Sequence, residues 1–577
     1  MAAFTWLGAD FQDEIVGLGP LMLIAPLLHK LDIESIIDQH LPADPQLEFP
    51  YGKILSLFIA ARLCQPNALV NIPNWAEENG ADILWNIPSD KLNDDRLGRA
   101  LDAFFEQRHN IMAQITHHVL RYTELGLGRL HFDTTDVTFY GAYERSLARP
   151  LVDFTHSFPS NSRLLPAHIT KGYLTDHRMI QVGVTSLVDD LGALPILCHP
   201  VDGNRNGHSA IHEQYLLLRQ YLPLPQEMQL VSDRGTFSAE HVARLRRHGH
   251  HVLCAVPWDD YRAIYDTHSS QLAWQQASYL SFEQQRRRET ASTLPQEHYQ
   301  LAAVPHARTD PETKKPIPCR LLFVYSTSGA KEEHQRRQEN IAKIQAGLDD
   351  IAAKLLRGHP KTTYQSAVKQ VTKLLGNKSA AKYFSWQLVE LAAAERQALP
   401  APQNGHKRAT YRLTYTYDPA QADADTQYDG LSAILATMPE PKTSDALFSE
   451  YKQQSYVELG HHQYKTPLAV RPVFLKSPRR VEALVCLLHI ALQVYQVLER
   501  RYRQRTPTDA PRQERRRTAE SLLRAFQVYG VSLRTTPVGQ TLHATRLRTQ
   551  QRHILGRLGL PTPNNFFAQI LPPISSG

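Results

Sequence analysis

The pattern of apolar and polar residues predicts a helical region at the start of the chain. Residues 16–125 carry apolar positions at helical spacing, in short runs broken by Pro20, Pro26 and Pro42. Asn93 or Asp94 can serve as the N-cap of a helix that continues through residues 96–108. We expect a helical N-terminal domain over residues 1–128. It could include a helix-turn-helix that binds DNA or be a plain helical domain.

From residue 130 the pattern becomes typical of strands that alternate with helices. Aromatic, Thr and Val residues are frequent in the predicted strands, and two amphipathic stretches predict helices. The predicted strands cover residues 130–140, 180–188, 194–199, 229–232 and 251–256, and the helices cover 208–222 and 237–248. Three antiparallel strands followed by α/β units is the ribonuclease H arrangement. The expected fold class is therefore α/β (mixed α+β), with the first part of a ribonuclease H-like core at residues 129–258.

The pattern changes again after residue 258. Helical and strand-like stretches alternate without the regular order of the core, which predicts a large α/β insertion over residues 259–440. A helix is then expected over residues 444–465, followed by another over 479–503. These two helices form the predicted second part of the core, residues 441–503. The remainder, residues 504–577, is a basic C-terminal region.

Composition and charge agree with a soluble, reduced protein that has an anionic partner. The chain has 577 residues, is 42% hydrophobic and 21% charged, and carries a net charge of +7. Its five cysteines are isolated, which argues against a zinc ribbon or a disulfide framework and favours a cytoplasmic location. Acidic residues precede the apolar run at 16–31, unlike a signal peptide. Polar residues within 481–498 predict a buried helix there and no membrane span.

Two aspartates on predicted strands are the main candidates for chemistry. Asp133 and Asp233 each lie at the end of a strand-like segment, on the first and fourth strands of the core. These two strands are neighbours in a ribonuclease H sheet, so we expect the carboxylates to lie close together. Glu458 would complete the set from a helix packed against the sheet. Three carboxylates suit Mg²⁺, and two such ions about 4 Å apart can act on a phosphodiester.

The predicted helix that carries Glu458 has an unusually polar face. Tyr451, Gln454, Glu458 and Lys465 are spaced so that they share one side of a helix. Mixed charges suit a phosphate and a metal ion, and a solvated helix face is the alternative interpretation. Asp136 competes with Asp133 for the role of metal ligand. Strand alternation places the two on opposite faces, and Asp136 could instead lie at a turn or contact a basic group.

The order of these motifs resembles a known family. Tyr451-x2-Gln454-x3-Glu458-x6-Lys465 resembles the signature Y-x2-R-x3-E-x6-K of bacterial DDE transposases of the insertion-sequence-four family. The segments H-F-D-T-T-D at 131–136 and L-V-S-D-R-G at 230–235 resemble the two aspartate segments of that family. The resemblance covers roughly residues 16–500. The chain is similar to a long branch of the family that has a helical N-terminal region and a large insertion.

The resemblance implies DNA transposition, with DNA cleavage at the ends of an element and strand transfer into target DNA. Asp133, Asp233 and Glu458 would be catalytic and would hold two Mg²⁺ ions, which Mn²⁺ could replace. Tyr451, Gln454 and Lys465 would contact DNA at the element end. The partners implied are element ends, target DNA and a second copy of the chain, in a homodimer at the nucleoid. Gln454 departs from the arginine of the signature and lacks its charge.

Two other functions fit the same residues. One is a decayed or repurposed DNA-binding protein without cleavage activity, which the glutamine at position 454 favours. The other is a metal-dependent nuclease that hydrolyses DNA but joins no strands. The arginines at positions 500–517 are expected to add non-specific DNA affinity, or else to form a solvated linker.

Overall fold

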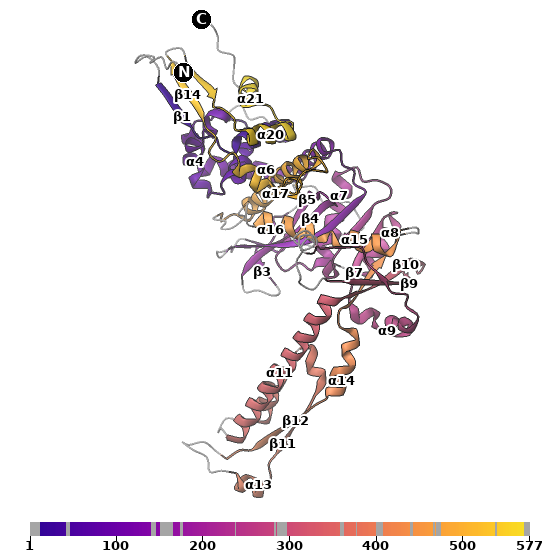
Figure 1. Ribbon diagram of the computed structural model, residues 1–577. Coiled ribbons are helices and arrows are strands. Elements are labelled where there is room, and N and C mark those ends of the chain that lie inside the picture. Colours follow the sequence, from indigo (N-terminus) through magenta and orange to yellow (C-terminus); the bar gives the residue numbers. More distant parts are fainter. Residues whose placement is uncertain are drawn as a thin grey trace.

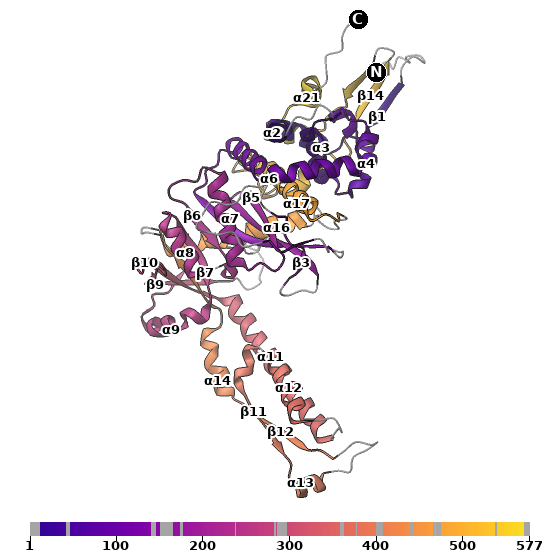
Figure 2. The same cartoon turned by 180° about the vertical axis from the view of Figure 1, so that it is seen from behind.

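The protein has an α/β body, a helical region at one end of the body and an arm that projects from the other end (Figure 1, Figure 2). The computed structural model describes residues 12–41, 47–139, 143, 146–149, 165–172, 177–236, 238–281, 284, 297–357, 363–376, 378–399, 408–438, 442–465, 468, 475–536 and 539–570.

The core strands pair in the predicted order. The elements are β2 (Arg129–Phe139), β4 (Arg178–Asp189), β5 (Gly192–Asp202), α7 (Gly207–Tyr221), β6 (Gln229–Ser232), α8 (Ala239–Arg247) and β7 (His251–Val256). β2 is parallel to β6 and β6 to β7, whereas β4 is antiparallel to both β2 and β5. Helices α7 and α8 supply connections long enough to join parallel strands. The strand order β5-β4-β2-β6-β7 is that of ribonuclease H, so the predicted fold class is confirmed.

Part of the predicted insertion belongs to the sheet instead. After α9 (Trp258–His268), the sheet continues beyond β7 through β13 (Leu431–Ala436), β10 (Pro316–Ser326), β9 (Tyr299–Thr309) and β8 (Gln275–Gln276). At its opposite edge, β3 (Thr170–Lys171) pairs with β4. The partner of β7 is β13, which lies about 175 residues later in the chain. Pairing at such separation leaves no local sequence pattern, so the segment 259–440 resembles one insertion until the strands are seen together.

The projecting arm is the part of this segment that leaves the sheet. It comprises α11 (Thr327–Arg357), α12 (Tyr364–Leu375), β11 (Phe384–Glu390), α13 (Ala393–Ala398), β12 (Tyr411–Tyr417) and α14 (Pro419–Ala424). Ile344, Leu348, Val371, Phe384 and Leu413 belong to a small hydrophobic core of its own. Figure 1 and Figure 2 both show α11 leading away from the body and α13 at the far end.

The N-terminal helices surround one long buried helix. They are α1 (Leu21–Lys30), α2 (Ile33–His40), α3 (Tyr51–Cys64), α4 (Ile72–Glu78), α5 (Ala81–Trp85) and α6 (Asp94–Thr123). The side chain of Asn93 caps α6, as predicted, by accepting a hydrogen bond from Arg96 N. α17 (Pro478–Gln504) packs against α3, α6 and β5. By length and composition it could cross a membrane, but its apolar stretch is entirely buried within the protein, as predicted for a core helix.

The C-terminal residues pack back onto the N-terminal region. They form α18 (Arg512–Arg515), α19 (Ala519–Arg524), β14 (Val531–Thr536), β15 (Gly539–Ala544), α20 (Thr549–Leu558) and α21 (Pro563–Ile570). β14 pairs with β1 (Gln12–Val16) near the start of the chain. Several arginines of the 500–517 run form ion pairs within the fold. Arg500, only 2% exposed, makes a bidentate contact with Asp189, and Arg503 pairs with Glu499 at 2.8 Å. For Arg500 and Arg503 the solvated-linker interpretation is therefore wrong, whereas Arg505, Arg515 and Arg516 are exposed.

Candidate active site

Asp133 and Asp233 occupy neighbouring positions where two parallel strands stop pairing. The last paired residues of β2 and β6 are Phe132 and Ser232, and each aspartate is the next residue in its strand direction. Paired strands lie about 4.8 Å apart, so the two carboxylates start from adjacent backbone positions. The predicted proximity of the first and fourth strands is confirmed. Asp133 does not end its strand, however, because β2 continues to Phe139 in pairing with β4.

The polar helix expected over residues 444–465 is two helices in the structure. α15 (Ser444–Lys452) ends before Gln453, and α16 (Gln454–Lys465) begins after it. At this break the Gln453 side chain accepts a hydrogen bond from Arg129 and donates one to Asp190. Tyr451 therefore lies on a different helix from Glu458, and the single face predicted for both does not form as one continuous helix.

α16 is fixed against the end of the sheet by buried polar contacts. His131 Nδ1 donates a hydrogen bond to Gln454 Oε1 at 2.7 Å, and Gln454 Nε2 donates to the Phe132 carbonyl at 3.3 Å. At the other end of the helix, Tyr464 Oη donates to the Val485 carbonyl of α17 at 2.7 Å. These contacts hold the helix beside the residues that flank Asp133.

The expectation that Gln454 faces DNA does not fit this arrangement. Its side chain is buried, at 8% exposure, and joins α16 to β2. One turn later Glu458 is exposed on the same helix. The side of α16 that packs against β2 includes position 454. The residue at this position of the signature is therefore used for packing. The role of Tyr451 and Lys465 in binding DNA stays a prediction.

The electrostatics join Asp133, Asp233 and Glu458 into one group. Burial, followed by the negative charges of Asp233 and Glu458, raises the pKa of the Asp133 carboxyl to about 7. Two of the opposing effects come from the Thr134 amide, which donates to Asp133 Oδ1 at 2.8 Å, and from Gln454. Burial also raises the pKa of the half-buried Tyr451, with further contributions from Asp233, Glu458 and Asp133. The charges of Asp233 and Glu458 therefore act on both Asp133 and Tyr451, although α15 and α16 are separate helices.

A histidine that no sequence motif pointed to completes this surface. His461 Nδ1 lies 3.5 Å from Asp133 Oδ2, and its side chain is only 12% exposed. Burial and the neighbouring Lys465 lower its pKa to about 4, so the ring is neutral at physiological pH and can donate a hydrogen bond to the carboxylate. The signal was present in the helical spacing, because position 461 shares a helix face with 458 and 465.

Asp136 contacts a basic group, as one of its two predicted roles required. Lys465 Nζ lies 2.8 Å from Asp136 Oδ1. The expectation that Asp133 and Asp136 would be kept apart by strand alternation is only partly met, because both reach α16. β2 has no partner on the β6 side beyond Phe132, so side chains from either face can reach a helix at that open edge. The long Lys465 side chain extends to the second aspartate.

The donor set suits a divalent cation. Oxygen-only ligands are what Mg²⁺ prefers, and a cation would offset both the burial and the neighbouring negative charges that raise the pKa of Asp133. Among the residues that the structure describes, no three His, Cys, Asp or Glu side chains are already arranged to hold a metal ion. The three carboxylates would have to draw together around one, and Glu458 has the exposure and the side-chain length to do so.

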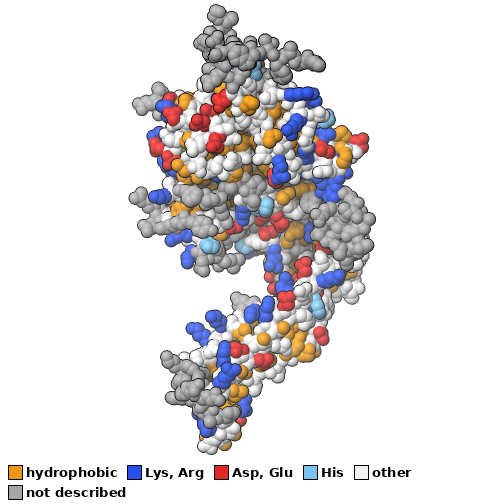
Figure 3. Space-filling view, turned by 60° about the vertical axis from the view of Figure 1, so that its left-hand side comes forward, with side chains coloured by type: hydrophobic (Ala, Val, Ile, Leu, Met, Phe, Trp, Pro, Cys, Tyr) orange, Lys and Arg blue, Asp and Glu red, His pale blue; other side chains and the backbone are white. Residues whose placement is uncertain are grey.

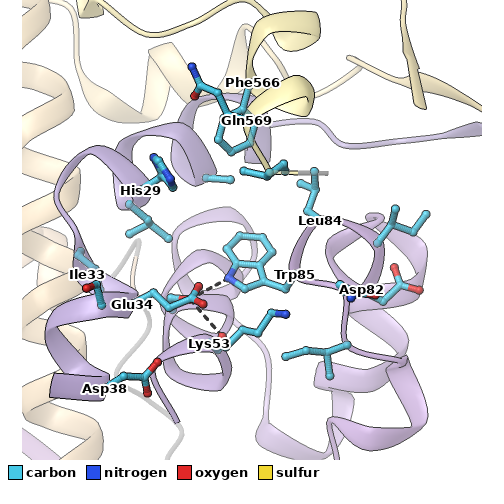
Figure 4. A pocket seen from close by; sticks show the side chains of 18 of the residues that line it. His29, Ile33, Glu34, Asp38, Lys53, Asp82, Leu84, Trp85, Phe566 and Gln569 are labelled. Carbon is cyan, nitrogen blue, oxygen red and sulfur yellow. Dashed lines mark hydrogen bonds between the residues drawn. The ribbon is translucent and has the colours of Figure 1, made fainter. Parts of the chain in front are cut away.

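A large cavity lies elsewhere, in the helical region. It has a volume of about 1200 Å³ and is lined by α1, α2, α5 and α21. Figure 4 shows Glu34, Asp38 and Lys53 around it, with Trp85 between the helices. Burial raises the pKa of both Glu34 and Asp38. A cavity with several carboxylates is unsuited to phosphate, so the candidate site for phosphodiester chemistry is the edge of the sheet.

Comparisons with known proteins match the chain to one family and to solved structures. Residues 14–117 match a family described as a domain of unknown function (DUF4277). The chain also matches a chain in the cryo-EM structure of a piggyBac transposase synaptic complex with hairpin DNA. The match covers 98% of this chain and 89% of the piggyBac chain, with a TM-score of 0.35 and 11% sequence identity. No curated protein matches the chain. The structural likeness is too low to carry a functional argument, and the matched domain ends before Asp133, so neither match assigns a role to the carboxylates.

Proposed function

We propose that this protein is a DDE transposase that cleaves DNA at the ends of a mobile element and transfers the 3′-hydroxyl strand into target DNA. The observation that supports this most is the position of Asp133 and Asp233, side by side where β2 and β6 stop pairing. Glu458 on α16 is close enough for its negative charge to raise the pKa of Asp133. The order of the motifs along the chain also resembles the insertion-sequence-four family. Membership of that family is part of the proposal.

In the proposed mechanism Asp133, Asp233 and Glu458 hold two Mg²⁺ ions, or Mn²⁺ in their place. Metal held by these residues would supply activation of the attacking oxygen and stabilisation of the leaving oxygen of the phosphodiester. The chain itself supplies the orientation. The Thr134 amide holds one oxygen of Asp133, and His461 faces the other. Groups that fix the direction of ligand carboxylates contribute strongly to metal sites.

The DNA partners follow from the same geometry. Tyr451 and Lys465 flank the carboxylates on α15 and α16 and are proposed to contact phosphates of the element end. Lys465 is 33% exposed and held by Asp136, so its charge is positioned before DNA arrives. Two ends must be held together for transposition, which we propose a homodimer does, at the nucleoid in the cytoplasm. Gln454 is not among the proposed DNA contacts.

Cleavage and joining of end DNA test this function. The DNA that flanks the reading frame is searched for inverted repeats, and a labelled duplex that carries one repeat is incubated with the protein, a circular plasmid and Mg²⁺. We expect a nick at the repeat boundary and a labelled strand joined to the plasmid. Both products should also form with Mn²⁺ and fail with Ca²⁺, whose longer and looser coordination misplaces the attacking oxygen.

The outcomes separate the competing functions. Hydrolysis of all duplexes without joined product would assign a nuclease. Binding without cleavage in either Mg²⁺ or Mn²⁺ would assign a DNA-binding protein that has lost its activity. Cleavage that persists in excess EDTA would contradict the metal mechanism.

A further inference from the structure

The outer half of the arm has a charge opposite in sign to that of its inner half. Residues 354–416 contain 11 Lys and Arg against 2 Asp and Glu, a net charge of +9, whereas the whole chain has +7. The inner parts of the arm, residues 327–353 and 417–428, contain 4 basic and 8 acidic residues, a net charge of −4. Residues 504–577 are basic as well, with 11 Lys and Arg against 3 Asp and Glu, but only in the arm does a strongly basic part lie next to an acidic one. We call the described residues between 354 and 416 the arm tip.

Lysines at the tip are available to a partner. Lys369 and Lys373 are exposed on one face of α12, while Ala367 and Val371 on its other face are buried against the arm core. Lys378 follows the helix and is exposed too. Within the described residues, these three side chains form no hydrogen bond or ion pair. Figure 3 shows Lys and Arg side chains gathered along one side of this lobe.

The tip also offers a place for a backbone to lie. A hollow of about 480 Å³ runs along α12 and is lined by Tyr364, Gln365, Val368, Lys369, Thr372 and Lys373. Its lining combines two ammonium groups with a phenol ring, one short apolar side chain (Val368), a hydroxyl and an amide. Such a lining suits a sugar-phosphate chain, whose phosphates are charged and whose sugars are less polar.

Topology connects the arm to the carboxylates. β2, β6 and β7 are parallel, β13 is antiparallel to β7, and β10 is antiparallel to β13. β10 therefore runs in the same direction as β2 and β6, and its last residue, Ser326, lies at the same edge of the sheet as Asp233. α11 begins at the next residue, Thr327. With 31 residues it extends about 45 Å from that edge.

We infer that the arm tip binds the backbone of duplex DNA about one helical turn away from the phosphodiester at the carboxylate site. This inference rests on the proposed function, which places DNA at that edge of the sheet. One turn of B-DNA spans about 34 Å, within the reach of α11. The contacts are to phosphates and carry no sequence preference.

The test compares two sets of three charges on the same arm. The tip variant carries Lys369→Gln, Lys373→Gln and Lys378→Gln. The control variant carries Lys331→Gln, Arg336→Gln and Lys343→Gln, three exposed positions on the acidic inner half of α11. Binding of full-length protein to a random-sequence 40-base-pair duplex is measured by fluorescence anisotropy over a series of salt concentrations. Circular dichroism verifies that both variants fold.

The tip variant should lower the slope of log affinity against log salt by up to about 2.7, because each phosphate that is no longer neutralised reduces the slope by about 0.9. The control variant should leave the slope unchanged. Hydroxyl-radical footprinting on end DNA should show protection about one turn from the nicked bond that only the tip variant loses. Equal slopes for the tip variant and wild type, or equal reductions in both variants, would overturn the inference. The same measurement is made with a single-stranded 40-mer. If the tip variant lowered the salt slope for this strand by the same amount, the tip would be assigned to single strands and the inference would be overturned as well.

These outcomes are independent of the proposed chemistry. Asp133→Asn should keep the wild-type salt slope while it stops cleavage. A reduced slope in the tip variant of a protein that never cleaves DNA would support the tip and contradict the transposase. Normal cleavage with an unchanged slope would do the reverse.

Discussion

The carboxylate site lies at the edge of the sheet from which α11 extends toward the arm tip. These two clusters of like charge differ in burial. At the carboxylate site, Asp133 is only 17% exposed and stands beside Asp233 and Glu458, and its pKa is raised to about 7. At the arm tip, Lys369 and Lys373 are exposed to water. Like charges that are buried repel strongly, whereas exposed ones are screened by solvent and salt.

The difference indicates what each cluster can bind. A buried carboxylate with two others beside it destabilises the protein until a cation joins it, so its ligand is a small ion at fixed positions. An exposed group of lysines costs little by itself, so its ligand is a diffuse polyanion. A third cluster shows the opposite case. Arg500 and Arg503 are positively charged, but they form ion pairs with Asp189 and Glu499, so their charges stabilise the fold.

The largest effect expected from this comparison is on catalysis. Asp133→Asn, Asp233→Asn and Glu458→Gln should each reduce DNA cleavage by more than about 100-fold, because even partners one shell beyond the metal cost 10-fold to 100-fold. The measurement is the rate of nicking of end DNA in Mg²⁺. Asp136→Asn is the matched control, since its carboxylate pairs with Lys465.

Retention of cleavage by any one of the three would remove that residue from the proposed metal site. A dead Asp136→Asn with an active Asp133→Asn would transfer the first aspartate role to position 136. DNA binding should survive in all four variants, since it depends on basic residues and phosphates.

The contrast between bound and available basic residues should appear in stability. Arg500→Gln removes the bidentate partner of Asp189, whose side chain is 35% exposed, and should lower the free energy of unfolding by about 1.5–3 kcal/mol. Lys373→Gln, at an exposed position, should change it by less than about 0.5 kcal/mol. Urea unfolding followed by circular dichroism measures both. Similar values for the two would mean that Arg500 contributes no more than a surface charge.

The raised pKa of Asp133 predicts how stability depends on pH without metal. The carboxyl ionises near 3.8 when unfolded and about 7 when folded, so the folded state binds the extra proton between these values. Stability should therefore fall as pH rises from about 4 to 7, by up to about 4 kcal/mol from this group. His461 stays neutral over most of this range, since its pKa is lowered to about 4.

Asp133→Asn should remove this dependence, so the variant should be more stable than wild type at pH 8 and similar to it at pH 4.5. Thermal unfolding in EDTA at the two pH values measures the difference. Wild type and variant curves that stay parallel from pH 4.5 to 8 would show that Asp133 ionises normally in the folded protein.

The smallest effect concerns the glutamine of α16. Gln454→Ala removes the hydrogen bonds to His131 and Phe132 and should lower the free energy of unfolding by about 1–3 kcal/mol. The salt dependence of DNA binding should not change. Gln370→Ala, at an exposed position of α12, is the control and should be near neutral. A stable Gln454→Ala variant with weaker DNA binding would restore the DNA-facing role expected from the signature.

The sequence predicted well those features that depend on local pattern. Strand and helix periodicity gave the order of the core, and that order placed Asp133 beside Asp233 before the strands were seen together. Features that depend on contacts between residues far apart in the sequence could not be predicted from the local pattern. The pairing of β13 with β7, the burial of Gln454 against β2 and the ion pair of Arg500 with Asp189 each join residues more than 170 positions apart. His461 lies between these cases, because its helical spacing was visible but its contact with Asp133 was not.

Divalent metal binding tests most directly whether the buried carboxylates form a catalytic metal site. Binding of Mn²⁺ to the full-length protein at pH 8 is measured by isothermal titration calorimetry for wild type, Asp133→Asn, Asp233→Asn and Asp136→Asn. We expect saturable binding to wild type and Asp136→Asn, and affinity at least about 10-fold weaker in the other two. Equal binding by all four proteins, or binding abolished only in Asp136→Asn, would contradict the site at Asp133 and Asp233.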